Sequence, residues 1–170
     1  MAAVLNPWDK RPPEEANLFN PAFLGSLMVE FAKEYEKSKP AGVPLTYIPI
    51  ALAVTLHRRT RARLPSSTVS SLYGWMQEHE DSLIGFSERV LGLTPYIREA
   101  LIFALYHKTL CFGEGHLVLR GEHKVHFSTA FLRETTTEVT ESINKTKFMA
   151  RWFAKSGSES SILACWGVRP

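Results

Sequence analysis

A repeat of apolar side chains at helical spacing is the feature that most constrains how this chain folds. Four such side chains recur at every fourth position: Phe23, Leu27, Phe31 and Tyr35. Residues spaced in this way share one face of a helix, and that face must be buried. Asn20 can cap the free amides at the helix start, Pro21 suits the first helical position, and Pro40 ends the helix. We therefore predict a mainly α fold whose first helix begins at residue 20.

Comparable signals predict five further helices. Their expected ranges are 45–56, about 69–76, 82–91, 94–108 and 136–155. The segment 45–56 is apolar on all sides, which is typical of a buried helix. Gly92 marks the end of one helix, and Thr94-Pro95 repeats the cap-plus-proline start of the next. The last helix, 136–155, carries acidic residues early and basic residues late, which suits the helix dipole.

A β-hairpin is expected directly after these helices. Leu110-Cys111-Phe112 and His116–Leu119 alternate in polarity and are joined by Gly113-Glu114-Gly115. A short loop with glycine between two such runs is typical of a hairpin. The order helix, turn, helix, hairpin is that of a winged helix, so we predict a winged-helix-like core with one β-hairpin wing.

Three segments follow from this reading of the chain. Residues 1–19 form an extended N-terminal arm, because Pro7, Pro12 and Pro13 disfavour a helix there. Residues 20–127 form the helical winged-helix-like domain. Residues 128–170 form a long C-terminal helix and a docking tail.

Composition sets the general class of the protein. The chain has 170 residues, 45% of them hydrophobic and 22% charged, as in an ordinary globular domain. The net charge of +3 is too weak to indicate nucleic-acid binding by itself. The two cysteines lie far apart, and the longest apolar stretch is too short for a membrane span. We expect a cytoplasmic protein.

The sequence carries no catalytic motif that we recognise. The phosphate-binding G-x-x-x-x-G-K-[ST] loop, the G-x-S-x-G elbow and the H-E-x-x-H zinc motif are all absent. One cluster could in principle bind zinc: Cys111, His116, His123 and His126. Its spacing matches no common zinc module, so surface histidines and a core cysteine are favoured instead. We expect no enzyme activity, no metal and no cofactor.

A run of arginines is the clearest binding feature. Arg58, Arg59, Arg61 and Arg63 follow the buried helix 45–56. Guanidinium groups pair bidentately with phosphates or carboxylates, so the run could contact DNA or an acidic partner. The alternative is a solvated helix end. We favour a protein partner over DNA, because the expected recognition helix carries few base-reading groups and Glu99 and Glu114 would repel phosphates.

The two ends of the chain supply further docking candidates. Trp8 and Phe19 lie in the arm, and Trp166 and Arg169 lie in the tail. Tryptophan and arginine dominate interface hot spots, although aromatic ends can also simply close a core.

Several motifs spread over the chain point to a family. They are Arg11-Pro12-x-Glu14-x-Ala16-Asn17-Leu18-Phe19-Asn20-Pro21-Ala22-Phe23, Ile84-Gly85-Phe86-x-Glu88-Arg89, Arg98-Glu99-Ala100 and Trp166-Gly167-Val168-Arg169-Pro170. These motifs resemble the middle components of bacterial three-component ABC-ATPase systems, which are similar to the small subunit of Lamassu-type anti-phage and anti-plasmid defence complexes. The resemblance implies an SMC/Rad50-like ATPase and an effector, often a nuclease, as partners.

Two functions are therefore open at this point. The first is a non-catalytic accessory subunit that bridges an SMC/Rad50-like ATPase and an effector, with DNA reached indirectly through the complex. The second is a stand-alone winged-helix DNA-binding transcriptional regulator.

Overall fold

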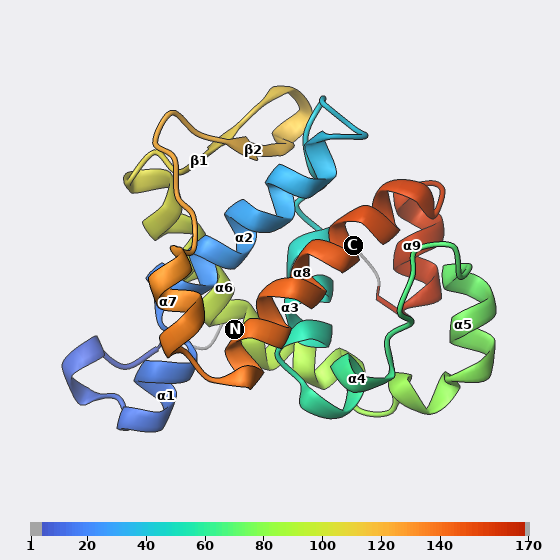
Figure 1. Ribbon diagram of the computed structural model, residues 1–170, viewed down its shortest axis with the longest axis horizontal. Helices are drawn as coiled ribbons and strands as arrows, with labels where there is room; N and C mark the ends of the chain where they lie inside the picture. The colour runs from blue at the N-terminus through green and yellow to red at the C-terminus, as the bar shows by residue number, and fades with distance from the viewer. Residues whose placement is uncertain (1–4, 169–170) are drawn as a thin grey trace.

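The fold is mainly helical with one antiparallel β-hairpin (Figure 1). The computed structural model describes residues 5–168. Its α-helices are α1 (Pro13–Leu18), α2 (Pro21–Glu36), α3 (Tyr47–Thr55), α4 (Arg58–Arg63), α5 (Leu72–Glu78), α6 (Phe86–Tyr106), α7 (Thr129–Glu134), α8 (Thr137–Lys155) and α9 (Glu159–Cys165). The strands are β1 (Leu110–Phe112) and β2 (Val118–Arg120), and short 3-10 turns are η1 (Trp8–Lys10), η2 (Glu80–Leu83) and η3 (Glu114–His116). The predicted fold class is confirmed.

Helix α2 lies at the centre of the core. It packs against both α6 and α8, and α3 contacts the same two helices. Leu24, Leu27 and Met28 are fully buried in this contact. The helix starts where the sequence predicts, since the Asn20 Oδ1 atom accepts hydrogen bonds from the amides of Ala22 and Phe23.

The hairpin covers the end of α2. Leu110 pairs with Arg120 and Phe112 with Val118, as the predicted β-hairpin requires. Val43 forms two backbone hydrogen bonds with Val118, both 2.8 Å long, which tie the loop after α2 to the hairpin. Gly121 cannot be replaced freely, because an added Cβ would lie 2.1 Å from the carbonyl oxygen of Lys108.

The expected break between helices 82–91 and 94–108 is wrong. Helix α6 is continuous through Pro95, and Gly92 lacks the positive φ of a glycine helix cap. Pro95 removes one amide donor, and the carbonyl left free belongs to Leu91, whose 70% exposure lets water satisfy it. The helix–turn–helix of the predicted winged-helix-like core is therefore not formed.

The N-terminal arm is not extended as predicted. Pro13 occupies the first position of α1, where its missing amide costs nothing because no helical hydrogen bond is made there. Neither η1 nor α1 buries any residue, so the arm is folded locally but lies on the surface (Figure 1).

The C-terminal segment belongs to the core. The predicted helix 136–155 is confirmed as α8, capped by Thr136, and α7 and α9 are additional helices that the sequence pattern did not predict. Helix α9 brings Trp166 to 4.9 Å from Phe86 and 6.0 Å from Trp75, measured between ring centroids. No helix within residues 5–168 is long and apolar enough to cross a membrane.

Candidate partner-binding surface

The four arginines of residues 58–63 are positioned by the short helix α4. His57 caps this helix by accepting a hydrogen bond from the Thr60 amide. Burial at the end of α3 lowers the pKa of His57, and the nearby arginines lower it further, so the ring is neutral at neutral pH. The helix fixes the arginine backbone, but the four side chains point in different directions and have different surroundings.

Arg61 is not a surface residue, which corrects its assignment as a binding candidate. Its side chain is 2% exposed, and Nη1 donates to the carbonyl of Thr55 at 2.8 Å. Nη2 lies 3.1 Å from Glu138, and Nε lies 3.5 Å from Glu141. Arg61 therefore joins α3, α4 and α8 inside the protein. A charge buried in this way is costly unless it is paired, and the two glutamates provide the pairing.

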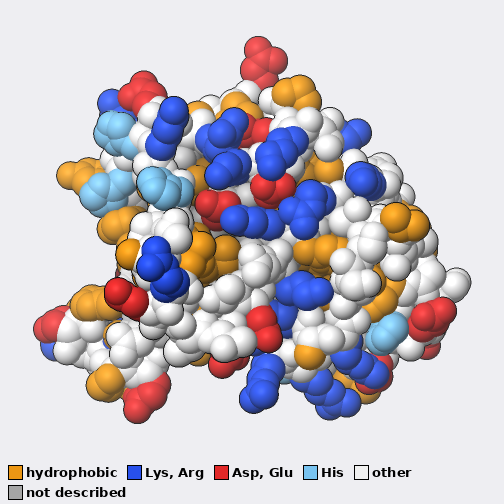
Figure 2. Space-filling view, in the orientation of Figure 1, with side chains coloured by type: hydrophobic (Ala, Val, Ile, Leu, Met, Phe, Trp, Pro, Cys, Tyr) orange, Lys and Arg blue, Asp and Glu red, His pale blue; other side chains and the backbone are white. Residues whose placement is uncertain are grey.

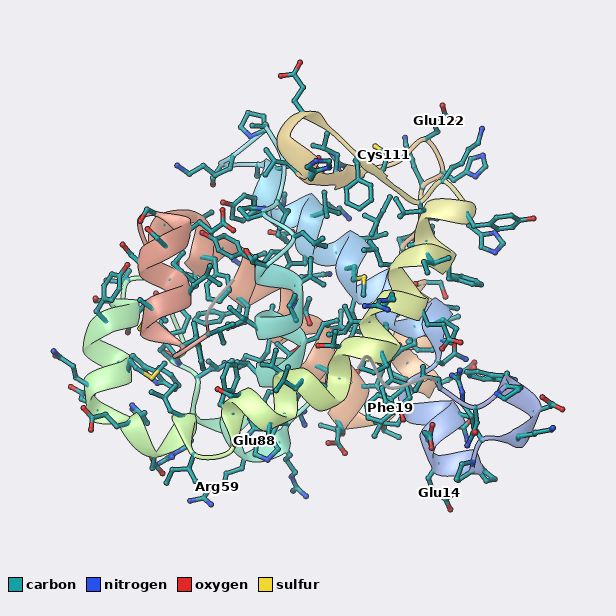
Figure 3. All side chains as sticks on the ribbon, turned by 180° about the vertical axis from the view of Figure 1, so that it is seen from behind. Glu14, Phe19, Arg59, Glu88, Cys111 and Glu122 are labelled. Atoms are coloured by element: carbon teal, nitrogen blue, oxygen red, sulfur yellow. The ribbon has the colours of Figure 1, made fainter. Side chains whose placement is uncertain are left out.

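The other three arginines form an exposed edge. Arg58 and Arg59 are exposed and Arg63 is half-buried. Arg63 forms an ion pair with Asp81, and Arg59 lies 3.7 Å from the same carboxylate. These arginines hold the pKa of Asp81 below its usual range, mainly through the hydrogen bond from Arg63. In Figure 3, Arg59 and Glu88 project from the same end of the molecule, where α6 begins.

Helix α6 also carries a row of exposed side chains along one face. Leu91, Ile102 and Tyr106 are 70%, 60% and 83% exposed, with the exposed Arg98 between them. We refer to these four residues as the α6 stripe. Sequence analysis missed it because the segment was divided into two helices. The spacing of residues 91, 98, 102 and 106 would have revealed it on one continuous helix.

The arm lies beside the middle of α6, where Figure 3 labels Phe19. Phe19 is half-buried, with its ring 4.3 Å from that of Tyr96. Trp8 is 44% exposed and stacks on Arg11, whose guanidinium lies 5.4 Å from the ring centre. Of the two arm candidates, Trp8 leaves more surface for a partner.

The tail candidates have different outcomes. Trp166 is 1% exposed and packed among Phe86, Trp75 and other core residues, so its assignment to docking is corrected to core packing. Arg169 lies outside the described residues.

A second cationic region covers α2 and α8, on the face shown in Figure 2, but its charges are largely compensated. Lys37 and Arg151 both reach Glu34, at 2.7 and 3.2 Å. Lys147 lies 3.2 Å from the buried Glu30. The ion pairs of Arg151 and Lys147 join the two helices, and the carboxylates weaken the surface as a site for DNA phosphates.

The zinc ligands considered from the sequence do not gather. Within residues 5–168, no group of three histidine, cysteine or acidic side chains is arranged to hold a metal ion. Cys111 lies exposed on the hairpin, and His123 uses its Nδ1 to contact the carbonyl of His107.

Comparison with known proteins places the chain in a family. A profile of the ABC-three component (ABC-3C) system Middle Component 3 family matches residues 8–170. Searches of the curated proteins and of the solved structures returned no significant match. Because the match spans nearly the whole chain, this protein belongs to the Middle Component 3 family of ABC-three component systems.

Proposed function

We propose that this chain is a non-catalytic accessory subunit that docks on the ABC ATPase of its three-component system and links it to an effector. Membership of a middle-component family supports an ATPase partner. An SMC/Rad50-like ATPase, a nuclease-type effector, a cytoplasmic location and a role in Lamassu-like anti-phage or anti-plasmid defence belong to this proposal. DNA would be reached through the assembled complex.

The observation that carries the proposal is the α6 stripe, together with the arginine edge near the start of the same helix. Leu91, Ile102 and Tyr106 expose large apolar side chains along one rigid helix. Large apolar side chains that are exposed together on one face of a helix typically mark a protein interface. Exposed cations near the start of the same helix add specificity and speed association with an acidic partner.

The test is reconstitution with the other two components of the system. Ile102→Asp combined with Tyr106→Asp should abolish co-purification, because two carboxylates would be buried in the interface without partners. Val69→Asp is the matched control, since Val69 is 92% exposed in the loop before α5. All variants should unfold at the wild-type temperature. Unchanged co-purification of the double variant would contradict docking through α6.

A stand-alone DNA-binding regulator is the alternative. It is weakened by the continuous helix α6, because the turn predicted between helices 82–91 and 94–108 is not formed. DNA binding by the isolated chain across a salt series separates the two functions. A regulator would bind selectively and with a steep salt dependence, whereas an accessory subunit would bind little without its partners.

A further inference from the structure

A small recess lies between α4 and the start of α6, next to the arginine edge. Its volume is about 110 Å³, and three arginines line it: Arg59, Arg63 and Arg89. Asp81 lines it as well, but this carboxylate is already engaged by Arg63 and Arg59. The recess therefore retains an excess of positive charge.

Arg89 is the cation with no counter-charge. It is half-buried, and no carboxylate within residues 5–168 forms an ion pair with it. Its side-chain hydrogen bond to the Thr60 hydroxyl is long, at 3.3 Å, and its guanidinium lies 5.6 Å from the ring centre of Phe86. Burial lowers the pKa of Arg89, which reflects the cost of holding this cation away from water without a partner.

Ser82 is a second donor that lacks a partner. Its residue is 6% exposed, and its hydroxyl is buried without any hydrogen bond within the described residues. Ser82 lines the same recess as Arg89. Helix α6, which begins beside it, has no side-chain cap at Gly85. A buried hydroxyl without a partner is costly, so these donors are more stable when an acceptor occupies the recess.

We propose that this recess binds one carboxylate group, supplied by an aspartate or glutamate side chain of the subunit that docks on this chain. The proposal rests on the proposed function and names the chemistry of one contact within it. A carboxylate suits the fork of Arg89 and can also accept a hydrogen bond from Ser82. It would supply the counter-charge that the chain itself does not provide.

A protein carboxylate fits the recess better than a nucleic-acid backbone. The recess accommodates a single small group, whereas a backbone presents a continuous row of phosphates. Asp81 lines the recess, and Glu88 projects at the same end of the molecule as Arg59 (Figure 3). Asp81 is already engaged by Arg63 and Arg59, but the charge of Glu88 would repel the neighbouring phosphates of a polyanion.

The first experiment titrates the full chain with acetate while NMR follows the Ser82 amide and the Arg89 Nε–H group. We expect saturable shifts, with Arg89→Gln weakening the affinity about tenfold, as the loss of one charge-assisted hydrogen bond predicts. Ser82→Ala should also weaken it without lowering the unfolding temperature. Arg133→Gln is the control, because Arg133 is exposed on α7 and does not line the recess. Shifts that do not saturate, or Ser82 amide shifts that saturate with wild-type affinity in Arg89→Gln, would overturn the site.

The second experiment measures binding of the same variants to the ATPase component. Arg89→Gln should weaken binding about tenfold, while Arg133→Gln should have little effect. Wild-type binding with no loss in Arg89→Gln overturns the inference but leaves the proposed function standing. Failure of the wild-type chain to bind any component overturns the proposed function. The acetate titration alone then shows whether the recess binds a carboxylate. A short DNA duplex that shifts the same signals at lower concentration than acetate would overturn the choice of a protein carboxylate.

Discussion

Arg11 and Glu99 form a bidentate ion pair across 88 residues of sequence, with both Nη–Oε distances at 2.7 Å. The side chain of Arg11 is 3% exposed, so the guanidinium is shielded from water in this contact. The hydroxyl of Tyr96 adds a hydrogen bond to Glu15 at 2.9 Å. Because η1 and α1 bury no residue, these polar contacts and the contact between the rings of Phe19 and Tyr96 hold the arm against α6.

Replacing Arg11 by alanine should release the arm without unfolding the core. The loss of a shielded bidentate pair should favour local opening by about 2 kcal/mol. Hydrogen exchange of the amides in residues 8–18 should accelerate, while the exchange of α2 and α8 stays unchanged. Glu14→Gln is the control, because Glu14 projects away from α6 in Figure 3. Equal acceleration in both variants would contradict the assigned role of the pair.

The same substitution should destabilise the protein at Arg61 but have little effect at Arg58. Arg61→Met keeps much of the buried volume but removes the hydrogen bond to Thr55 and the pairing with Glu138 and Glu141. We expect a loss of about 2 kcal/mol in the free energy of unfolding. Arg58→Met changes an exposed side chain and should stay within about 0.5 kcal/mol. Chemical denaturation measures both, and equal stabilities would show that the Arg61 network contributes nothing.

Glu34 should make the stability of the chain sensitive to acid. Burial acts to raise its pKa, but the hydrogen bonds from Lys37 and Arg151 outweigh burial and lower the pKa below its ordinary value. A carboxyl whose pKa is lowered on folding stabilises the protein above the pKa of the unfolded chain, and this contribution disappears as the pH falls through the folded pKa. Glu34→Gln should therefore cost about 1 kcal/mol at neutral pH and progressively less below about pH 4.

The control for this pH dependence is Glu134→Gln. Glu134 is exposed at the end of α7, and no ion pair within the described residues involves it. Its variant should follow the wild-type curve of stability against pH. A gap between wild type and Glu34→Gln that is the same at pH 3 and pH 7 would show that the carboxylate charge is not the cause.

Local signals predicted much of the fold because several helix starts are determined by nearby residues. Asn20 caps α2 and Thr136 caps α8 at the positions that the sequence indicates. The same signals misled at Thr94-Pro95, where a cap-plus-proline pair lies inside α6. A proline can lie inside a helix where solvent satisfies the carbonyl it leaves free, and exposure at Leu91 is a tertiary property that no local pattern reveals.

The candidate site was predictable only in part for a similar reason. The arginine run was visible in the sequence, but the direction of each side chain depends on α4 and on distant carboxylates. Arg61 meets Glu138 and Glu141 from α8, and Arg63 meets Asp81 from η2. In the sequence, Arg89 stands out only as part of a family motif. That it lacks a carboxylate partner depends on how α4 packs against α6, which the sequence pattern does not reveal.

Trp166 provides the test of whether the tail belongs to the core or to an interface. Its indole is enclosed by Phe86 and Trp75, with centroid distances of 4.9 and 6.0 Å. Trp166→Ala should therefore lower the free energy of unfolding by about 3 to 5 kcal/mol, as large truncations in a core do. Trp8→Ala is the comparison, because Trp8 is 44% exposed and should cost far less stability. Thermal unfolding of the isolated chain decides between the two roles, since a docking residue affects only assembly. A Trp166→Ala variant that unfolds like wild type but fails to bind its partners would show that Trp166 acts in docking and not in the core.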